Sequence, residues 1–196
     1  MAQRRDSLQA LQALGYRQAG YFSAAQAVKA GFSYQAQKYH VDSGNWLRIE
    51  RGIFRLRDWP ASVDDALVLW TLWSRHRGVI SHASALAVHD LGVLDPGTVT
   101  MTVPPGFRAS TPAVRTFTGT LATDDVEERE GYRVTTPLRT LLDASAYERQ
   151  EVVDDIVTEA VARGLVSRRA LRLRADAFGD RAALRIERAL TAGEEG

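Results

Sequence analysis

The sequence predicts an α+β fold in two parts, a small helical module with a hairpin over residues 1–60 and a mixed domain over residues 61–196. Three observations predict this division. In the first sixty residues, short capped helices precede a stretch in which apolar and charged residues alternate. After residue 60, helical and strand patterns alternate along the chain. The net charge also differs between the two parts. We expect the second part to hold a small antiparallel sheet wrapped by several helices.

The first two helices are predicted from their end signals. The first is expected to start after Asp6, with leucines three residues apart on one face, and to end at Gly15. Ser23 and Gln26 have the spacing of a capping box, in which each side chain accepts a hydrogen bond from the backbone N–H of the other residue. A second helix is therefore expected to begin at Ala24.

A tight turn leads from the second helix to a third. Gly31 can end the second helix, and Ser33 caps a third that runs to about Asp42. This is the layout of a helix-turn-helix, whose second helix reads the major groove. Glutamine can pair with adenine, and lysine can reach guanine or a phosphate. The candidate DNA contacts of this helix are Ser33, Tyr34, Gln35, Gln37 and Lys38.

Gln35 is the expected base-reading residue, because it lies in the first turn beside Tyr34 and Lys38. A competing interpretation rotates the helix by about half a turn and places Gln37 and His40 in the groove. His40 is otherwise expected to lie partly in the core.

Alternation of apolar and charged residues over 46–57 predicts a β-hairpin with one apolar and one polar face. Gly52 supplies the permissive backbone of its turn. A hairpin after a helix-turn-helix is the wing of a winged helix. We expect its arginines to contact phosphates, namely Arg48, Arg51, Arg55 and Arg57.

The second part alternates helical and strand patterns. A mostly apolar helix is expected over 63–75 and a short helix from Ser81 through His89, with a turn at residues 92–97. Strands are expected at 98–103, 114–117, 125–128 and 132–134, the last two forming a hairpin around Gly131. Further helices are expected after Thr136, over 152–161, after Ser167 and over about 181–192.

Charge is unevenly distributed along the chain. Residues 1–60 hold nine Lys and Arg against four Asp and Glu, a net charge of +5. Residues 61–162 hold eight against fifteen, or −7, and residues 163–196 hold eight against five, or +3. The basic head suits a nucleic-acid partner. The basic tail offers a second surface, or a solvated helix face, around Arg168, Arg169, Arg172 and Arg174.

Three stretches resemble AbiEi-type antitoxins of type IV toxin–antitoxin, or abortive infection, systems. Gly31-Phe32-Ser33 followed by Gly44 to Leu56 is similar to the winged-helix domain of that family. Ser81-His82-Ala83-Ser84-Ala85-Leu86 and Val134 to Asp143 are similar to segments of the antitoxin domain that follows it. The family usually has aliphatic residues where Gln37 and His40 stand, which leaves open which face of the third helix is buried.

The resemblance implies a phage-defence function in two parts. The winged helix would bind operator DNA and repress the protein's own operon. The following domain would counter a nucleotidyltransferase-like toxin without forming a stable complex with it. We expect a monomer, or a dimer assembled on DNA.

The residues favour a protein that is not an enzyme and has no cofactor. There is no cysteine, and the phosphate-binding loops, zinc-protease and hydrolase motifs are missing. His82 and His89 with Asp90 could bind zinc, although a structural role is favoured and no metal is expected. No membrane partner and a cytoplasmic location are expected. Two alternatives stay open, a nucleic-acid-processing enzyme delivered to DNA by the winged helix, and a winged-helix protein-interaction scaffold.

Overall fold

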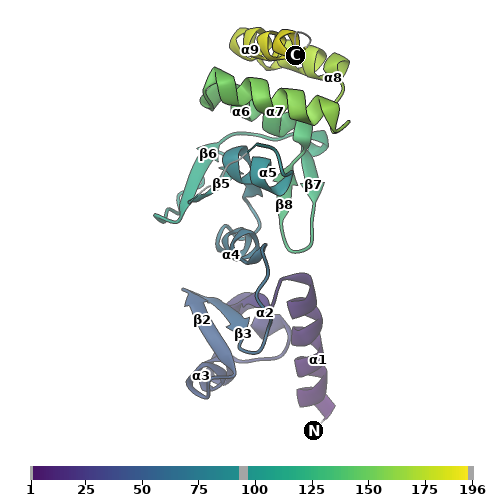
Figure 1. The fold of residues 1–196 in the computed structure, drawn as a ribbon. Helices are drawn as coiled ribbons and strands as arrows, with labels where there is room; N and C mark the ends of the chain where they lie inside the picture. Colours follow the sequence, from purple (N-terminus) through teal and green to yellow (C-terminus); the bar gives the residue numbers. More distant parts are fainter. Residues whose placement is uncertain (1, 93–96, 194–196) are drawn as a thin grey trace. The chain divides into compact units, whose positions relative to one another are not determined.

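The computed structural model describes residues 2–92 and 97–193 and confirms the α+β class (Figure 1). By its contacts the chain divides into two compact units. Unit 1 comprises Met1–Arg77 with Arg129–Tyr132, and unit 2 comprises Gly78–Glu128 with Arg133–Gly196. The division after Arg77 differs from the boundary predicted at residue 60, because the helix over residues 65–73 packs with the strands of unit 1.

Unit 1 places four helices around a three-stranded antiparallel sheet of order β1-β3-β2. The strands are β1 (Tyr21–Ser23), β2 (Trp46–Glu50) and β3 (Ile53–Leu56), and the helices are α1 (Ala2–Arg17), α2 (Ala24–Lys29), α3 (Tyr34–Asp42) and α4 (Asp65–Trp73). Its core contains Leu11, Phe22, Ala27, Phe32, Trp46 and Phe54. Edge-to-face ring contacts hold this core together, with 4.8 Å between the ring centroids of Phe22 and Trp46.

The predicted end of the first helix is wrong. Helix α1 already includes Asp6 and continues past Gly15 to Arg17. Gly15 serves packing instead, since a Cβ added there would lie 3.2 Å from Leu56 and 3.3 Å from Trp59. After the helix the chain turns at Gly20, which has a φ of +79° and lies against the Trp59 ring.

Unit 2 contains a five-stranded sheet of order β6-β5-β4-β8-β7. Its strands are β4 (Val79–Ile80), β5 (Val99–Val103), β6 (Val114–Thr118), β7 (Val126–Glu128) and β8 (Arg133–Thr135), with the 3₁₀ helix η1 (Thr123–Asp125) before β7. The expected antiparallel sheet is wrong in part. β4 pairs with β8, and β5 with β6, in parallel. The sheet is therefore mixed, with antiparallel pairs β4–β5 and β7–β8.

The described residues of unit 2 also form five α-helices. They are α5 (His82–Val88), α6 (Pro137–Tyr147), α7 (Gln150–Ala162), α8 (Arg168–Phe178) and α9 (Asp180–Ala192), of which the last four gather in layers on one side of the unit (Figure 1). Their buried aliphatic side chains form an extensive core that includes Leu141, Ile156, Leu171 and Ile186. The predicted turn at residues 92–97 lies mostly outside the described residues.

Candidate nucleic-acid interface

Local signals set the geometry of α2 and α3 as predicted. The Ser23 hydroxyl accepts the Gln26 N–H at 3.2 Å, and Gln26 Oε1 accepts the Ser23 N–H at 2.8 Å, which confirms the capping box. The Ser33 hydroxyl accepts the Ala36 N–H at 3.2 Å and so begins α3 at Tyr34. Gly31, with a φ of +97°, makes the turn between the two helices.

One face of α3 is exposed to solvent. Tyr34 and Tyr39 are 73% and 60% exposed, and Gln35 and Lys38 lie beside them. Lys38 Nζ lies 2.5 Å from Asp42 Oδ2 in an exposed ion pair one turn further along. Such an exposed pair contributes about 0–1 kcal/mol and can exchange its partner for a phosphate at little cost. Four of the five residues predicted on this helix are thus accessible: the cap Ser33, and Tyr34, Gln35 and Lys38.

Gln37 is a correction to the predicted set. Its side chain is buried and donates through Nε2 to the carbonyl oxygen of Ala24 at 3.1 Å and to that of Phe32 at 3.0 Å. The amide therefore links α3 to the start of α2, at Ala24, and to the turn between the two helices, at Phe32. A side chain committed in this way is not available to a base edge, which also argues against the rotated helix.

His40 lies half-buried, as expected, and completes the other face of α3. Its ring stacks on Trp46 with 4.7 Å between centroids and 13° between planes. It also meets the Phe32 ring edge-on at 5.4 Å. The orientation of α3 is therefore fixed by its contact with the start of β2.

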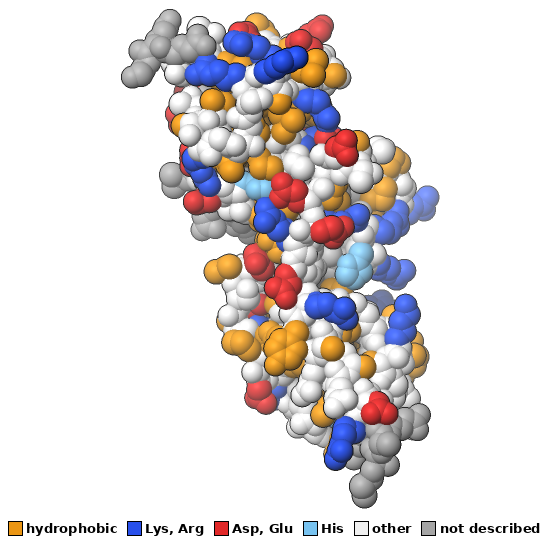
Figure 2. Space-filling view, turned by 90° about the vertical axis from the view of Figure 1, so that its right-hand side faces the viewer, with side chains coloured by type: hydrophobic (Ala, Val, Ile, Leu, Met, Phe, Trp, Pro, Cys, Tyr) orange, Lys and Arg blue, Asp and Glu red, His pale blue; other side chains and the backbone are white. Residues whose placement is uncertain are grey.

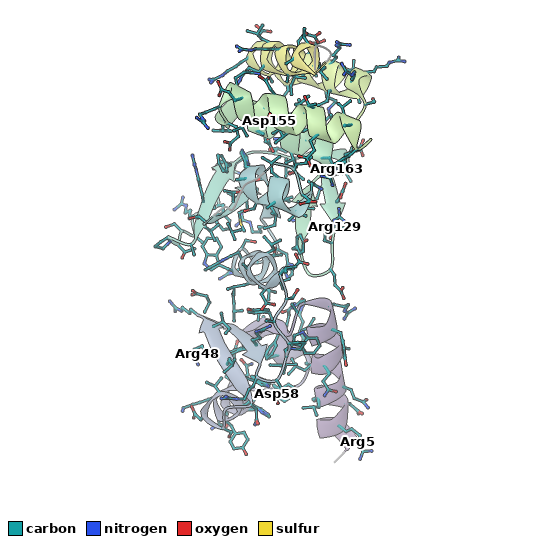
Figure 3. The ribbon with its side chains drawn as sticks, viewed as in Figure 1. Arg5, Arg48, Asp58, Arg129, Asp155 and Arg163 are labelled. Atoms are coloured by element: carbon teal, nitrogen blue, oxygen red, sulfur yellow. The ribbon has the colours of Figure 1, made fainter. Side chains whose placement is uncertain are left out.

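The β2–β3 hairpin carries two exposed arginines. Arg48, labelled on β2 in Figure 3, extends into solvent beside the Phe54 ring, with 5.6 Å between guanidinium carbon and ring centroid. Arg51 lies in the turn with Gly52, whose φ is +74°. The register shifts between Arg48 and Glu50, a bulge that twists the hairpin near its end.

Arg55 is a second correction. Its side chain is only 14% exposed and forms an ion pair with Asp65 at 2.8 Å. It also donates to the Pro60 carbonyl at 2.9 Å and lies over the Tyr21 ring. Arg55 therefore fastens β3 to α4 and is not free to bind a phosphate. Arg57 is exposed, and its Nε donates to the Gly44 carbonyl.

The second basic surface is partly neutralised within unit 2. Arg172 binds both carboxylate oxygens of Glu187 at 2.8 and 3.0 Å and holds the pKa of Glu187 below its usual value. Arg174 pairs with Asp125, and Arg168 donates to the Leu190 carbonyl. Arg169 is exposed. Two of the four arginines are thus paired with carboxylates, so this surface offers less charge than its sequence indicates.

The histidines of unit 2 serve separate structural contacts. His82 Nδ1 hydrogen-bonds the Ser81 hydroxyl at 2.8 Å, and its ring stacks on Phe117 at 3.5 Å. Burial, with Arg139 and Arg115 nearby, lowers the pKa of His82 to about 4. His89 Nε2 donates to the Thr135 carbonyl at 2.7 Å. Within residues 2–92 and 97–193 no group of three or more metal-ligating side chains gathers.

A buried charge network joins η1, α6 and α8. Arg139 donates to Asp143 Oδ1 at 2.9 Å and to Asp125 Oδ2 at 3.1 Å, and Arg174 binds the other oxygen of Asp125. Asp143 Oδ2 is buried without a hydrogen-bond partner. Burial raises the pKa of Asp143 to about 6, against the pull of Arg139. Sequence patterns did not reveal this network, because its members come from three separate elements.

Comparison with known proteins supports the fold. No protein-family model matches the chain, and a search of curated proteins found no similar sequence. The crystal structure of the RV2827C protein from Mycobacterium tuberculosis is similar, with a TM-score of 0.61 over 95% of this chain and 77% of that chain. The two sequences are 14% identical, so the likeness concerns the fold alone. Within the described residues no helix is both long and apolar enough to span a membrane.

Proposed function

We propose that unit 1 is a winged helix that binds double-stranded DNA, with α3 as the recognition helix and the β2–β3 hairpin as the wing. The observation that carries this proposal is the exposed face of Tyr34, Gln35 and Lys38 on a helix capped at Ser33. Recognition helices meet base edges with the side chains of their first turns. Arg48 and Arg51 supply exposed cations on the hairpin for the flanking phosphates.

We further propose that the protein is a non-enzymatic AbiEi-type antitoxin that represses its own operon. Support comes from the ordered motifs at residues 31–56, 81–86 and 134–143. In this proposal unit 2 counters a nucleotidyltransferase-like toxin. The structure adds that the second and third motifs build the buried core of unit 2, since Ser81, Leu86 and Leu141 are all fully enclosed.

Replacing both Arg48 and Arg51 with alanine is expected to weaken binding to all duplexes and to lower the slope of log K against log salt by about two. Each phosphate contact contributes a slope of about 0.9. The measurement is a salt series of full-length protein on a fluorescent random-sequence duplex. Arg17→Ala, an exposed arginine on α1, is the matched control. An unchanged slope in the double variant would remove the hairpin from the interface.

The two functions should be separable in cells. The Arg48→Ala, Arg51→Ala double variant is expected to lose repression of a reporter driven by the protein's own upstream region. It should still rescue growth from the nucleotidyltransferase-like toxin that the proposal requires, because unit 2 is unaltered. Loss of rescue with normal folding would contradict the division of functions between the units.

A further inference from the structure

A groove in unit 1 lies apart from the exposed face of α3. It has a volume of about 520 Å³ and is bordered by α1, by the end of α3 with the loop that follows it, and by the end of β3. Pockets for small ligands usually have about 300–1,000 Å³. Figure 2, which faces α1, shows apolar side chains exposed on unit 1 among isolated charged ones.

Two pairs of aromatic side chains line the groove. Tyr16 and Trp59 meet edge to face, with 4.9 Å between ring centroids, and Tyr16 is 71% exposed. The half-buried His40 ring is stacked on the buried Trp46 ring beneath it. Leu8, also at the rim, is 46% exposed. These surfaces suit a flat apolar ring, which can pack against aromatic side chains without displacing them.

A fixed guanidinium adds a cation to this lining. Arg57 donates from Nε to the Gly44 carbonyl, and a Cβ at residue 44 would lie 2.7 Å from Arg57 Nη2. Gly44, with a φ of +73°, therefore lets the guanidinium lie against the backbone. In the described part of the chain no carboxylate forms an ion pair with Arg57. A planar guanidinium held in this way can bind a carboxylate through two parallel N–H groups.

Asp58 also lines the groove, and its charge narrows the class of ligand. Its carboxylate repels ligands of high negative charge, such as nucleotides, more strongly than a singly charged acid. A purely polar anion would gain nothing from the exposed aromatic side chains of the lining. We propose that this groove is a binding site for a small planar aromatic carboxylate, with its ring against the aromatic side chains of the lining and its carboxylate on Arg57.

The position of the groove also suggests regulation, which rests on the proposed function. His40 at the end of α3 and Trp46 at the start of β2 are both lining residues. Their stacking fixes α3 against the hairpin. A ligand that shifts this pair would change the alignment of the two DNA-contacting elements, and so the affinity for DNA.

The test uses 2-naphthoate as the probe and full-length protein without DNA. An acid of about 13 non-hydrogen atoms is expected to bind with a dissociation constant of about 1 mM or tighter. Amide NMR shifts should cluster around Tyr16, Gly44 and Trp59. Arg57→Gln should weaken binding by about ten-fold or more and Tyr16→Ala by several-fold, while Arg17→Gln on the same unit should have no effect.

Two matched compounds test the chemistry. Naphthalene-2-carboxamide keeps the rings without the charge, and cyclohexanecarboxylate keeps the charge without the aromatic rings, so both should bind more weakly. The proposal would be overturned if 2-naphthoate did not bind at concentrations several times the expected dissociation constant. It would also be overturned if the amide NMR shifts clustered away from the groove, or if either matched compound bound as tightly as 2-naphthoate. Because these measurements contain no DNA, a failure here is distinct from a failure of the DNA-binding function, which the salt series tests.

Discussion

Gln37→Ala is expected to destabilise unit 1 by about 3 kcal/mol. The substitution removes two hydrogen-bond donors from the buried carbonyls of Ala24 and Phe32 and leaves a cavity beneath α3. Gln37→Glu should cost at least as much, because it places carboxylate oxygens against the same two carbonyl oxygens. The effect is expected in folding, and DNA binding should fall only as far as the folded population falls.

Urea unfolding followed by tryptophan fluorescence measures this effect. All four tryptophans of the chain lie in unit 1, so their emission reports that unit. Gln35→Ala, two residues earlier and exposed, is the control and should change stability by less than about 0.5 kcal/mol. Equal stability of the Gln37→Ala protein and the wild type would contradict the buried position of Gln37.

Two buried titratable groups of unit 2 are expected to give opposite pH dependences of stability. The pKa of Asp143 is about 6 in the folded protein against 3.8 ordinarily, so between these values only the folded state holds the proton. Its contribution to the free energy of unfolding therefore falls as pH rises from about 4 to 6. The pKa of His82 is about 4 in the folded protein against 6.5 ordinarily, so between these two values only the unfolded state holds the proton. The contribution of His82 to the free energy of unfolding therefore rises as pH rises from about 4 to 6.5.

Each contribution is on the order of 3 kcal/mol, because each pKa shifts by about two units. In the wild type the two largely cancel. In Asp143→Asn only His82 remains, so unit 2 should lose stability as pH falls from about 6.5 to 4. In His82→Asn only Asp143 remains, so unit 2 should lose stability as pH rises from about 4 to 6. Asparagine is chosen for position 82 because His82 has a φ of +54°, which asparagine tolerates.

Amide hydrogen exchange in α6 and α7 measures the stability of unit 2, which has no tryptophan. Acid residues elsewhere act alike in the three proteins, so the differences between them isolate the two groups. Parallel pH profiles in the wild type and both variants would show that neither group is perturbed as described.

The sequence predicted those features that depend on neighbouring residues. The Ser23–Gln26 box and the Ser33 cap are hydrogen bonds within one turn of helix, so their spacing alone defines them. The hairpin around Gly52 follows from period-two alternation. Each of these signals involves residues close in the chain.

Features that depend on distant partners were not predicted. Gly15 resembles a helix end, but it lies within α1 because Leu56 and Trp59 pack against it. Strand β4 has two residues and no pattern of its own, and its parallel pairing with β8 joins segments more than fifty residues apart. The hairpin pattern predicts Arg55 as a phosphate ligand, but its guanidinium is paired with Asp65 of α4. In each case the deciding group lies in another element of the fold.

The central claim, that α3 reads DNA with its exposed face, is tested most directly by the ratio of specific to random affinity. A preferred duplex is first selected from a random library with full-length protein. Gln35→Ala should then weaken binding to that duplex by about 1–3 kcal/mol and leave binding to random DNA nearly unchanged, so the ratio falls by about five-fold to more than 100-fold. An unchanged ratio, or no duplex preferred by the wild type, would contradict the account.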